Sequence, residues 1–150
     1  MKILQSLASG LAGAAALTLV HEIARRVDPD APRMDILGMR SLTKIMESAD
    51  EEPPEGSTLH SMAMAGDMVS NSLFYSLTGT GKDAWWRGAG LGLAAGLGAV
   101  YLPGPMGLGE APSNRTTKTQ IMTVAWYTLG GLAAAAASRA ISNTFDNEDE

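Results

Sequence analysis

Three polar residues in the segment 59–77 are the first candidates for chemistry, because the segment is otherwise rich in apolar and small residues. At 100° per residue, His60, Asp67 and Asn71 fall on one narrow side of a helix. Ionisable groups inside a membrane-spanning helix are costly, and they often mark a path for protons or ions. Histidine changes charge near neutral pH, which suits proton sensing or relay. The stripe therefore predicts a polar intramembrane site.

The spacing along the helix limits what this stripe can do. His60 and Asp67 would lie about 10 Å apart along the axis, too far for a direct hydrogen bond, whereas Asp67 and Asn71 are one turn apart and can interact. We prefer the interpretation that Asp67 bonds to a neighbouring helix and that His60 lies at the level of the lipid headgroups. A small transporter, channel or proton-responsive protein is the alternative.

His21 and Glu22 are a second pair of polar residues, at the end of an apolar stretch. Imidazole and carboxylate groups can bind metals, but the chain has no HExxH or ExxH spacing. Glu22 and Arg26 are four residues apart and can form a surface ion pair on a helix. We therefore expect no metal site, and no pattern in the sequence indicates a cofactor.

The sequence also lacks the usual motifs of enzymes. It contains no cysteine, no GxSxG and no GxxxxGK[ST], so thiol nucleophiles, serine nucleophile elbows and phosphate loops are unsupported. The run TGTGKD at 78–83 has the wrong spacing for a phosphate loop and is expected to be a turn. We expect a protein without catalytic residues.

Small residues form a further pattern, which concerns helix packing. Gly88, Gly92 and Gly96 recur every four residues, as in a glycine zipper, and allow another helix to approach closely. Gly130 and Gly131 belong to a second face of small residues. The two faces predict tight packing inside the chain, or contact with a second copy or a larger membrane complex.

Composition favours a membrane location for the elements that hold these residues. Charged residues make up 18% of the 150, below the roughly 25% of a typical soluble domain, and they gather in a few segments. The net charge of -5 provides no basic stripe for phosphates, so we expect no binding to nucleic acid. The lipid bilayer is the expected partner.

Four segments are predicted to span the membrane, in a single all-α domain that forms a membrane-spanning helical bundle. They cover residues 3–20, 59–77, 84–102 and 119–141, and a bilayer needs about 20 residues at 1.5 Å per residue. Trp85, Trp86 and Tyr101 at the ends of the third segment match an aromatic belt. The second segment is the most polar, so a soluble helical bundle that binds a partner stays an alternative.

The remaining segments are polar. Residues 21–57 form a polar connection with an expected interfacial helix at 34–47, residues 103–118 are expected to form a turn region, and 142–150 is an acidic tail. Basic residues are more numerous in the connections after the first and third spans, which favours both termini outside the cytoplasm. The excess is small and leaves the orientation open.

The last third of the chain contains the run YLPGPMGLGEAP, a polar turn and the run TQIMTVAWYTLGGLAAA. This arrangement, together with the general layout, resembles small bacterial inner-membrane proteins of the YagU-like type. The resemblance implies an inner-membrane setting and no catalytic residues. We therefore expect a small integral membrane protein that acts as an interaction or accessory component.

Overall fold

The computed structural model describes residues 2–146, which contain helices and no strand. The helices are α1 (Lys2–Val27), α2 (Met34–Ser48), α3 (Gly56–Ser76), α4 (Ala84–Tyr101), α5 (Ala111–Asn114) and α6 (Thr117–Asp146). The all-helical fold class is confirmed.

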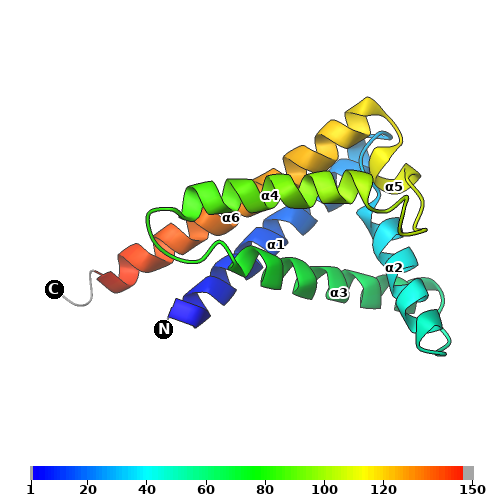
Figure 1. The fold of residues 1–150 in the computed structure, drawn as a ribbon, viewed down its shortest axis with the longest axis horizontal. Coiled ribbons are helices and arrows are strands. Elements are labelled where there is room, and N and C mark those ends of the chain that lie inside the picture. Colours follow the sequence, from blue (N-terminus) through cyan, green and yellow to red (C-terminus); the bar gives the residue numbers. More distant parts are fainter. Residues whose placement is uncertain (1, 147–150) are drawn as a thin grey trace.

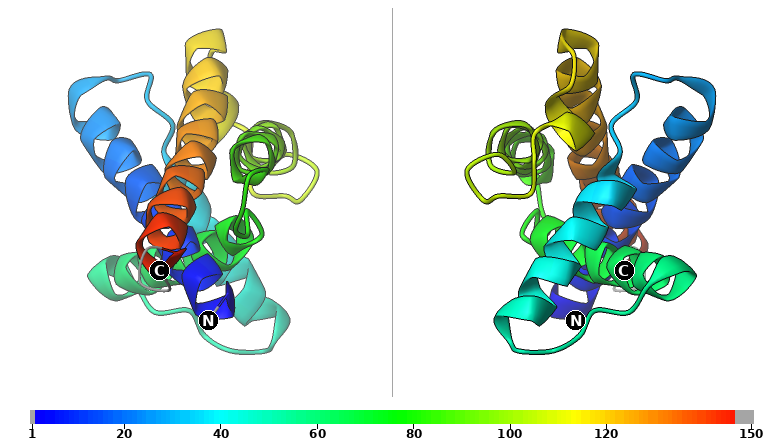
Figure 2. Two further views of the ribbon diagram at one scale, coloured as in Figure 1. Left: turned by 90° about the vertical axis from the view of Figure 1, so that its left-hand side faces the viewer. Right: turned by 90° about the vertical axis from the view of Figure 1, so that its right-hand side faces the viewer.

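The four long helices form an elongated bundle (Figure 1). α6 packs against α1 and α4, and α3 packs against α1 and α2. The start of α1, the end of α6 and the α3–α4 connection lie at one end, and α2 and α5 lie at the other. α3 and α4 are neighbours in sequence, but they diverge from their connection and make only minor contact (Figure 2).

The expectation of four spans is supported for two helices. α1 and the part of α6 from Thr117 to Thr144 are long and apolar enough to cross a bilayer. Within residues 2–146, α3 and α4 do not meet this criterion, because α3 carries the polar stripe with several serines, and α4 begins Ala-Trp-Trp-Arg and is rich in glycine. Core helices of soluble proteins and signal sequences also meet it, so membrane insertion needs a separate argument.

Several boundaries differ from the expected ones. α1 continues to Val27 instead of ending at residue 20, because Glu22 pairs with arginines one turn later on the same helix. α6 continues to Asp146, into the expected acidic tail, and residues 147–150 lie outside the described residues. The expected turn region 103–118 contains the short helix α5, with a proline in its first turn, where no backbone donor is needed. The helix expected at 34–47 is present as α2.

Glycines line the contact between α4 and α6. A Cβ atom added at Gly88 would lie 2.3 Å from the carbonyl oxygen of Gly131. Cβ atoms at Gly92 and Gly96 would lie 2.6 and 2.7 Å from Cα atoms of α6. The two backbones therefore touch directly, and this glycine ridge is occupied by a helix of the same chain.

Candidate functional site

His21, near the end of α1, is buried in the bundle. Only 7% of its surface is exposed, and its Nε2 atom has no hydrogen-bond partner among the described residues. The ring of Tyr127, on α6, meets the imidazole ring edge-on, with the ring centroids 5.7 Å apart. A buried polar atom without a partner costs about 1–3 kcal/mol, so a small polar ligand at this nitrogen would be favourable.

Asp67 lies on α3, on the side that faces α1 and α2. Asn71 lies one turn later on the same helix and is buried. Within residues 2–146, Asp67 takes part in no ion pair. It therefore carries a carboxyl group that no cation compensates.

His21 and Asp67 line the same small cavity, where α1, α2 and α3 meet. The cavity has a volume of about 20 Å³, and one water molecule needs about 10–15 Å³ of such space. Its lining residues are Thr18, His21, Glu22, Met34, Asp35, Gly38, Ala63, Met64 and Asp67. We call it the α1–α2–α3 cavity.

Two further carboxylates at this cavity are already paired with arginines. Glu22 accepts hydrogen bonds of 2.8 and 2.6 Å from Arg25 on the same helix. Asp35, at the start of α2, accepts bonds of 2.9 and 2.7 Å from the guanidinium of Arg33. Burial acts to raise the pKa of Asp35, but these bonds outweigh it and hold the pKa below the usual 3.8. Asp67 therefore differs from Glu22 and Asp35, because it has no arginine partner within residues 2–146.

The antiparallel register of α1 and α3 brings the end of α1 beside the first half of α3. Gly10 lies against the α3 backbone, where an added Cβ would be 2.2 Å from the carbonyl oxygen of Ser72. The two helices run in opposite directions, so His21, three turns after Gly10, lies opposite residues about three turns before Ser72, and Asp67 lines the cavity from a position nearer to Ser72. Ala63 lines the same cavity at that level.

His60 lies apart from this site. It is half-buried near the start of α3 and does not line the α1–α2–α3 cavity. The expected stripe is therefore divided, with Asp67 and Asn71 near His21 and His60 elsewhere. In the part of the chain that the structure describes, no group of three or more His, Asp or Glu side chains could hold a metal ion.

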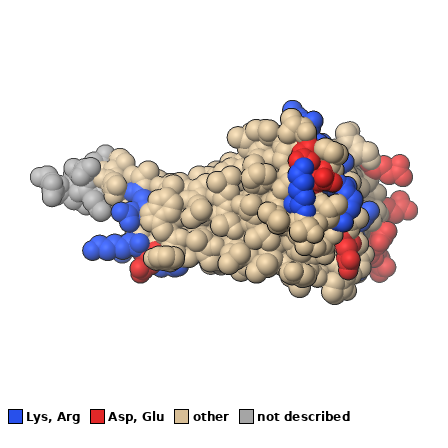
Figure 3. Space-filling view, turned by 90° about the horizontal axis from the view of Figure 1, so that it is seen from above, with Lys and Arg blue, Asp and Glu red and all other residues tan. Residues whose placement is uncertain are grey.

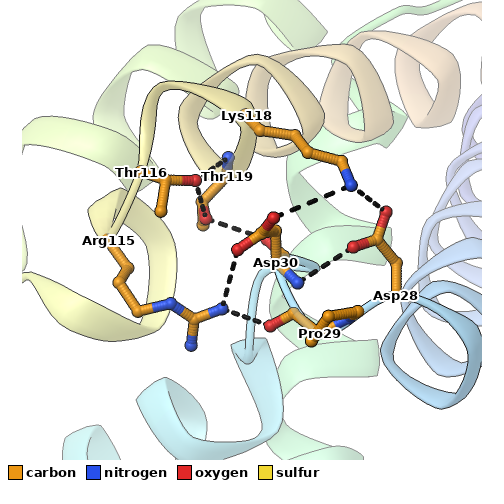
Figure 4. Close-up of polar contacts among 7 residues, drawn as sticks. All are labelled: Asp28, Pro29, Asp30, Arg115, Thr116, Lys118 and Thr119. Carbon is orange, nitrogen blue, oxygen red and sulfur yellow. Dashed lines mark hydrogen bonds and ion pairs between the residues drawn. The ribbon is translucent and has the colours of Figure 1, made fainter.

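A second polar cluster fixes the connection after α1 to the start of α6 (Figure 4). The Nζ atom of Lys118 lies 2.6 Å from the carboxylate of Asp28 and 3.7 Å from that of Asp30. Lys118 and the backbone N–H of Asp30 hold the pKa of Asp28 below its usual value of 3.8. The three charged residues therefore form one small network.

Backbone carbonyl groups extend this cluster. Arg115 donates a hydrogen bond to the carbonyl of Pro29 and lies 3.7 Å from the carboxylate of Asp30. The hydroxyl of Thr119 donates to the carbonyl of Asp30 at 2.8 Å. No sequence motif indicates this cluster, because the residues that meet in it lie more than 80 positions apart. Its contacts indicate a structural role.

Comparison of the chain with known protein families, curated proteins and solved structures finds no match. The resemblance to YagU-like proteins stays a prediction that rests on the last third of the chain. Function is therefore argued from the residues themselves.

Proposed function

We propose that this chain is a small integral membrane protein of a bacterial inner membrane that acts as a non-catalytic interaction or accessory component. The position of the charges carries the proposal. Lys, Arg, Asp and Glu gather at the two ends of the molecule, and the surface between them is uncharged on the face shown in Figure 3. Charged side chains are costly near the centre of a bilayer, so this distribution suits a protein with both ends in water.

The positions of the charges along the helices agree with the surface view. In α4 the charged residue is Arg87, in the first turn, and the basic residues of α6 are Lys118, at its start, and Arg139, in its last third. Among α1, α3, α4 and α6, as the structure describes them, the charged residue in the middle of a helix is Asp67 of α3, which lines the α1–α2–α3 cavity. The bundle therefore shields its one mid-helix carboxyl group.

Large apolar side chains cover the uncharged surface. Those with two-fifths or more of their surface exposed include Leu11, Leu19, Val69, Leu73, Leu93, Leu97, Ile121 and Leu129. Soluble monomers rarely expose so much apolar surface. We therefore place α1 and α6 across the bilayer, with α3 and α4 beside them in the same layer.

Cysteine labelling tests this placement, because the chain has no cysteine of its own. The two variants are Leu93→Cys, in the uncharged surface and 48% exposed, and Lys82→Cys, at an exposed position in the α3–α4 connection. In carbonate-washed membranes, a charged maleimide should label Lys82→Cys and should label Leu93→Cys only after detergent is added. Release of the protein by carbonate, with equal labelling at both positions, would contradict membrane insertion.

The crossing of α3 needs its own measurement, because its composition alone does not predict a span. Glu51→Cys lies before α3 and Lys82→Cys lies after it, and both positions are exposed. In sealed vesicles the charged maleimide should reach one of the two from outside and the other only after the vesicles are opened. Labelling of both from the same side would place α3 outside the membrane.

A proton-responsive protein, or a small transporter or channel, is a second candidate. It is favoured by one observation, which is that Asp67, partly buried at the α1–α2–α3 cavity, has no ion-pair partner within residues 2–146. Proteoliposomes with wild type and with Asp67→Asn provide the measurement. Equal proton flux in the two would remove the role of Asp67, and flux that depends on Asp67 would favour this candidate over an accessory component.

A further inference from the structure

The α1–α2–α3 cavity brings together two titratable side chains from different helices. The Nε2 atom of His21 is buried without a partner, and Asp67 pairs with no cation within residues 2–146. The cavity has space for one water molecule, and buried waters bond two to four otherwise unsatisfied polar groups. A water molecule there would satisfy both side chains.

We propose that this cavity is a proton-binding site, in which one water molecule joins Asp67 to His21 and the two side chains share a single proton. With that proton the pair is neutral overall, whether it consists of a carboxyl group and an imidazole or of a carboxylate and an imidazolium. Loss of the proton leaves one negative charge, and gain of a second leaves one positive charge. Either charge is costly away from water, so the site holds one proton.

The charges around the pair come from three helices and are largely compensated. Glu22 is paired with Arg25, and Asp35 is paired with Arg33. The facing groups are Glu22, Arg25 and Arg26 of α1, Arg33 and Asp35 of α2, Asn71 and Tyr75 of α3, and Tyr127 of α6. Glu22 and Asp35 each have an arginine beside them, so Asp67 is the carboxylate at this cavity that has no cation within residues 2–146.

Proton binding here would act on helix packing. The cavity lies where α2 and α1 each pack on α3, and residues of all three helices line it. A change in the number of bound protons places a charge at this junction, so the contact between α2 and α3 responds to pH. This inference gives the second candidate function a site. It does not depend on membrane insertion, because the cavity is made by contacts between helices.

Nuclear magnetic resonance tests the coupling, since the chain contains two histidines. The full chain, with ¹⁵N-labelled histidine rings, is titrated with acid in detergent micelles. Asp67→Asn should move the titration midpoint of His21 to lower pH, because the carboxylate that stabilises the imidazolium is gone. His60, outside the cavity, should shift much less. Asp83→Asn changes an exposed carboxylate between α3 and α4 and should move neither midpoint.

The reciprocal measurement uses infrared spectroscopy on a different variant. The carboxylic acid band of Asp67 is identified as the one that Asp67→Asn lacks, and its intensity is followed as the pH is lowered. In His21→Gln this band should appear at a higher pH than in wild type, because the imidazolium no longer stabilises the carboxylate. Linkage requires the two shifts to be equal in size. An unchanged His21 midpoint in Asp67→Asn protein with wild-type circular dichroism overturns the proposal, as does an unchanged carboxyl band in His21→Gln.

Discussion

The hydroxyl group of Tyr75 donates a hydrogen bond of 2.7 Å to the backbone carbonyl of Tyr127. This bond joins α3 to α6, two helices that otherwise make only minor contact. Tyr75 is fully buried, and its ring occupies space that a Cβ atom at Gly130 would enter, at 2.8 Å from the hydroxyl oxygen. Tyr75 therefore links α3 to α6, in addition to the packing of α3 on α1.

Tyr75→Phe should remove this hydrogen bond and keep the packing of the ring. We expect the free energy of unfolding to fall by about 1 kcal/mol, the usual contribution of one intramolecular hydrogen bond, measured by denaturant titration in detergent. Tyr101→Phe is the matched control, because Tyr101 is 64% exposed at the end of α4. Equal stability of the two variants would show that the Tyr75 bond contributes nothing.

The α4–α6 contact allows a comparison between two glycines on one helix. Gly88→Ala adds a Cβ atom 2.3 Å from the Gly131 oxygen, so the helices must separate, whereas Gly90→Ala meets no atom within 4 Å. We expect Gly88→Ala to lower the free energy of unfolding by about 1–3 kcal/mol. Gly90→Ala should raise it by about 0.5–1 kcal/mol through helix propensity. Similar effects of the two substitutions would contradict close packing at Gly88.

The pair of Arg33 and Asp35 predicts a pH-dependent effect at the start of α2. Arg33→Leu leaves the Asp35 carboxylate, 8% exposed, without its cation. At neutral pH the variant should lose about 1–2 kcal/mol of unfolding free energy, a discounted value because the Arg33 side chain is 40% exposed. The lowered pKa of Asp35 means that this stabilisation exists above pH 3.8 and disappears as the pH falls through the lower folded value.

Arg26→Leu is the control for this measurement. Arg26 lies 3.7 Å from Glu22 with 72% of its side chain exposed, and exposed ion pairs contribute little. Unfolding curves of both variants at neutral and acidic pH give the comparison. If Arg33→Leu loses the same amount of stability at neutral and acidic pH, the loss comes from the packing of the Arg33 side chain and not from its charge.

Helix positions in this chain follow from local sequence, whereas helix partners do not. Pro103 and the glycines around it predict the end of α4, and the apolar side of 34–47 predicts α2. Helices that follow one another in the sequence need not pack together, and α3 diverges from α4. The reason is that glycines let α4 lie on α6, while Tyr75 fits beside Gly130. Such fits between surfaces have no signal in a single segment.

The residues of the candidate site can be identified from the sequence, but their positions relative to one another cannot. The sequence indicates His21 as a polar group at the end of an apolar segment, and it predicts Asp67 and Asn71 as neighbours on one side of the segment 59–77. Their shared cavity depends on the register of α1 on α3, which the close contact of Gly10 with Ser72 sets. His60 was grouped with Asp67 because helical periodicity gives direction around an axis and no information about which neighbour lies at each level.

The ion pair between Lys118 and Asp28 predicts how acid acts on the cluster in Figure 4. The pKa of Asp28 is lowered, first by Lys118 and then by the Asp30 backbone N–H, so its contribution to stability is complete above pH 3.8. It is lost as the pH falls through the lower folded value. The melting temperature of Lys118→Met should therefore lie below that of wild type at pH 7, and the two should converge in strong acid.

Salt and a second lysine complete this experiment. The pair is exposed to solvent, so added salt at pH 7 should reduce the difference in melting temperature between Lys118→Met and wild type. Lys82→Met removes an exposed lysine from the α3–α4 connection, away from the cluster, and should give a difference that does not change between pH 7 and strong acid. If Lys118→Met shows a constant difference as well, the loss comes from the packing of the Lys118 side chain and not from its charge beside Asp28.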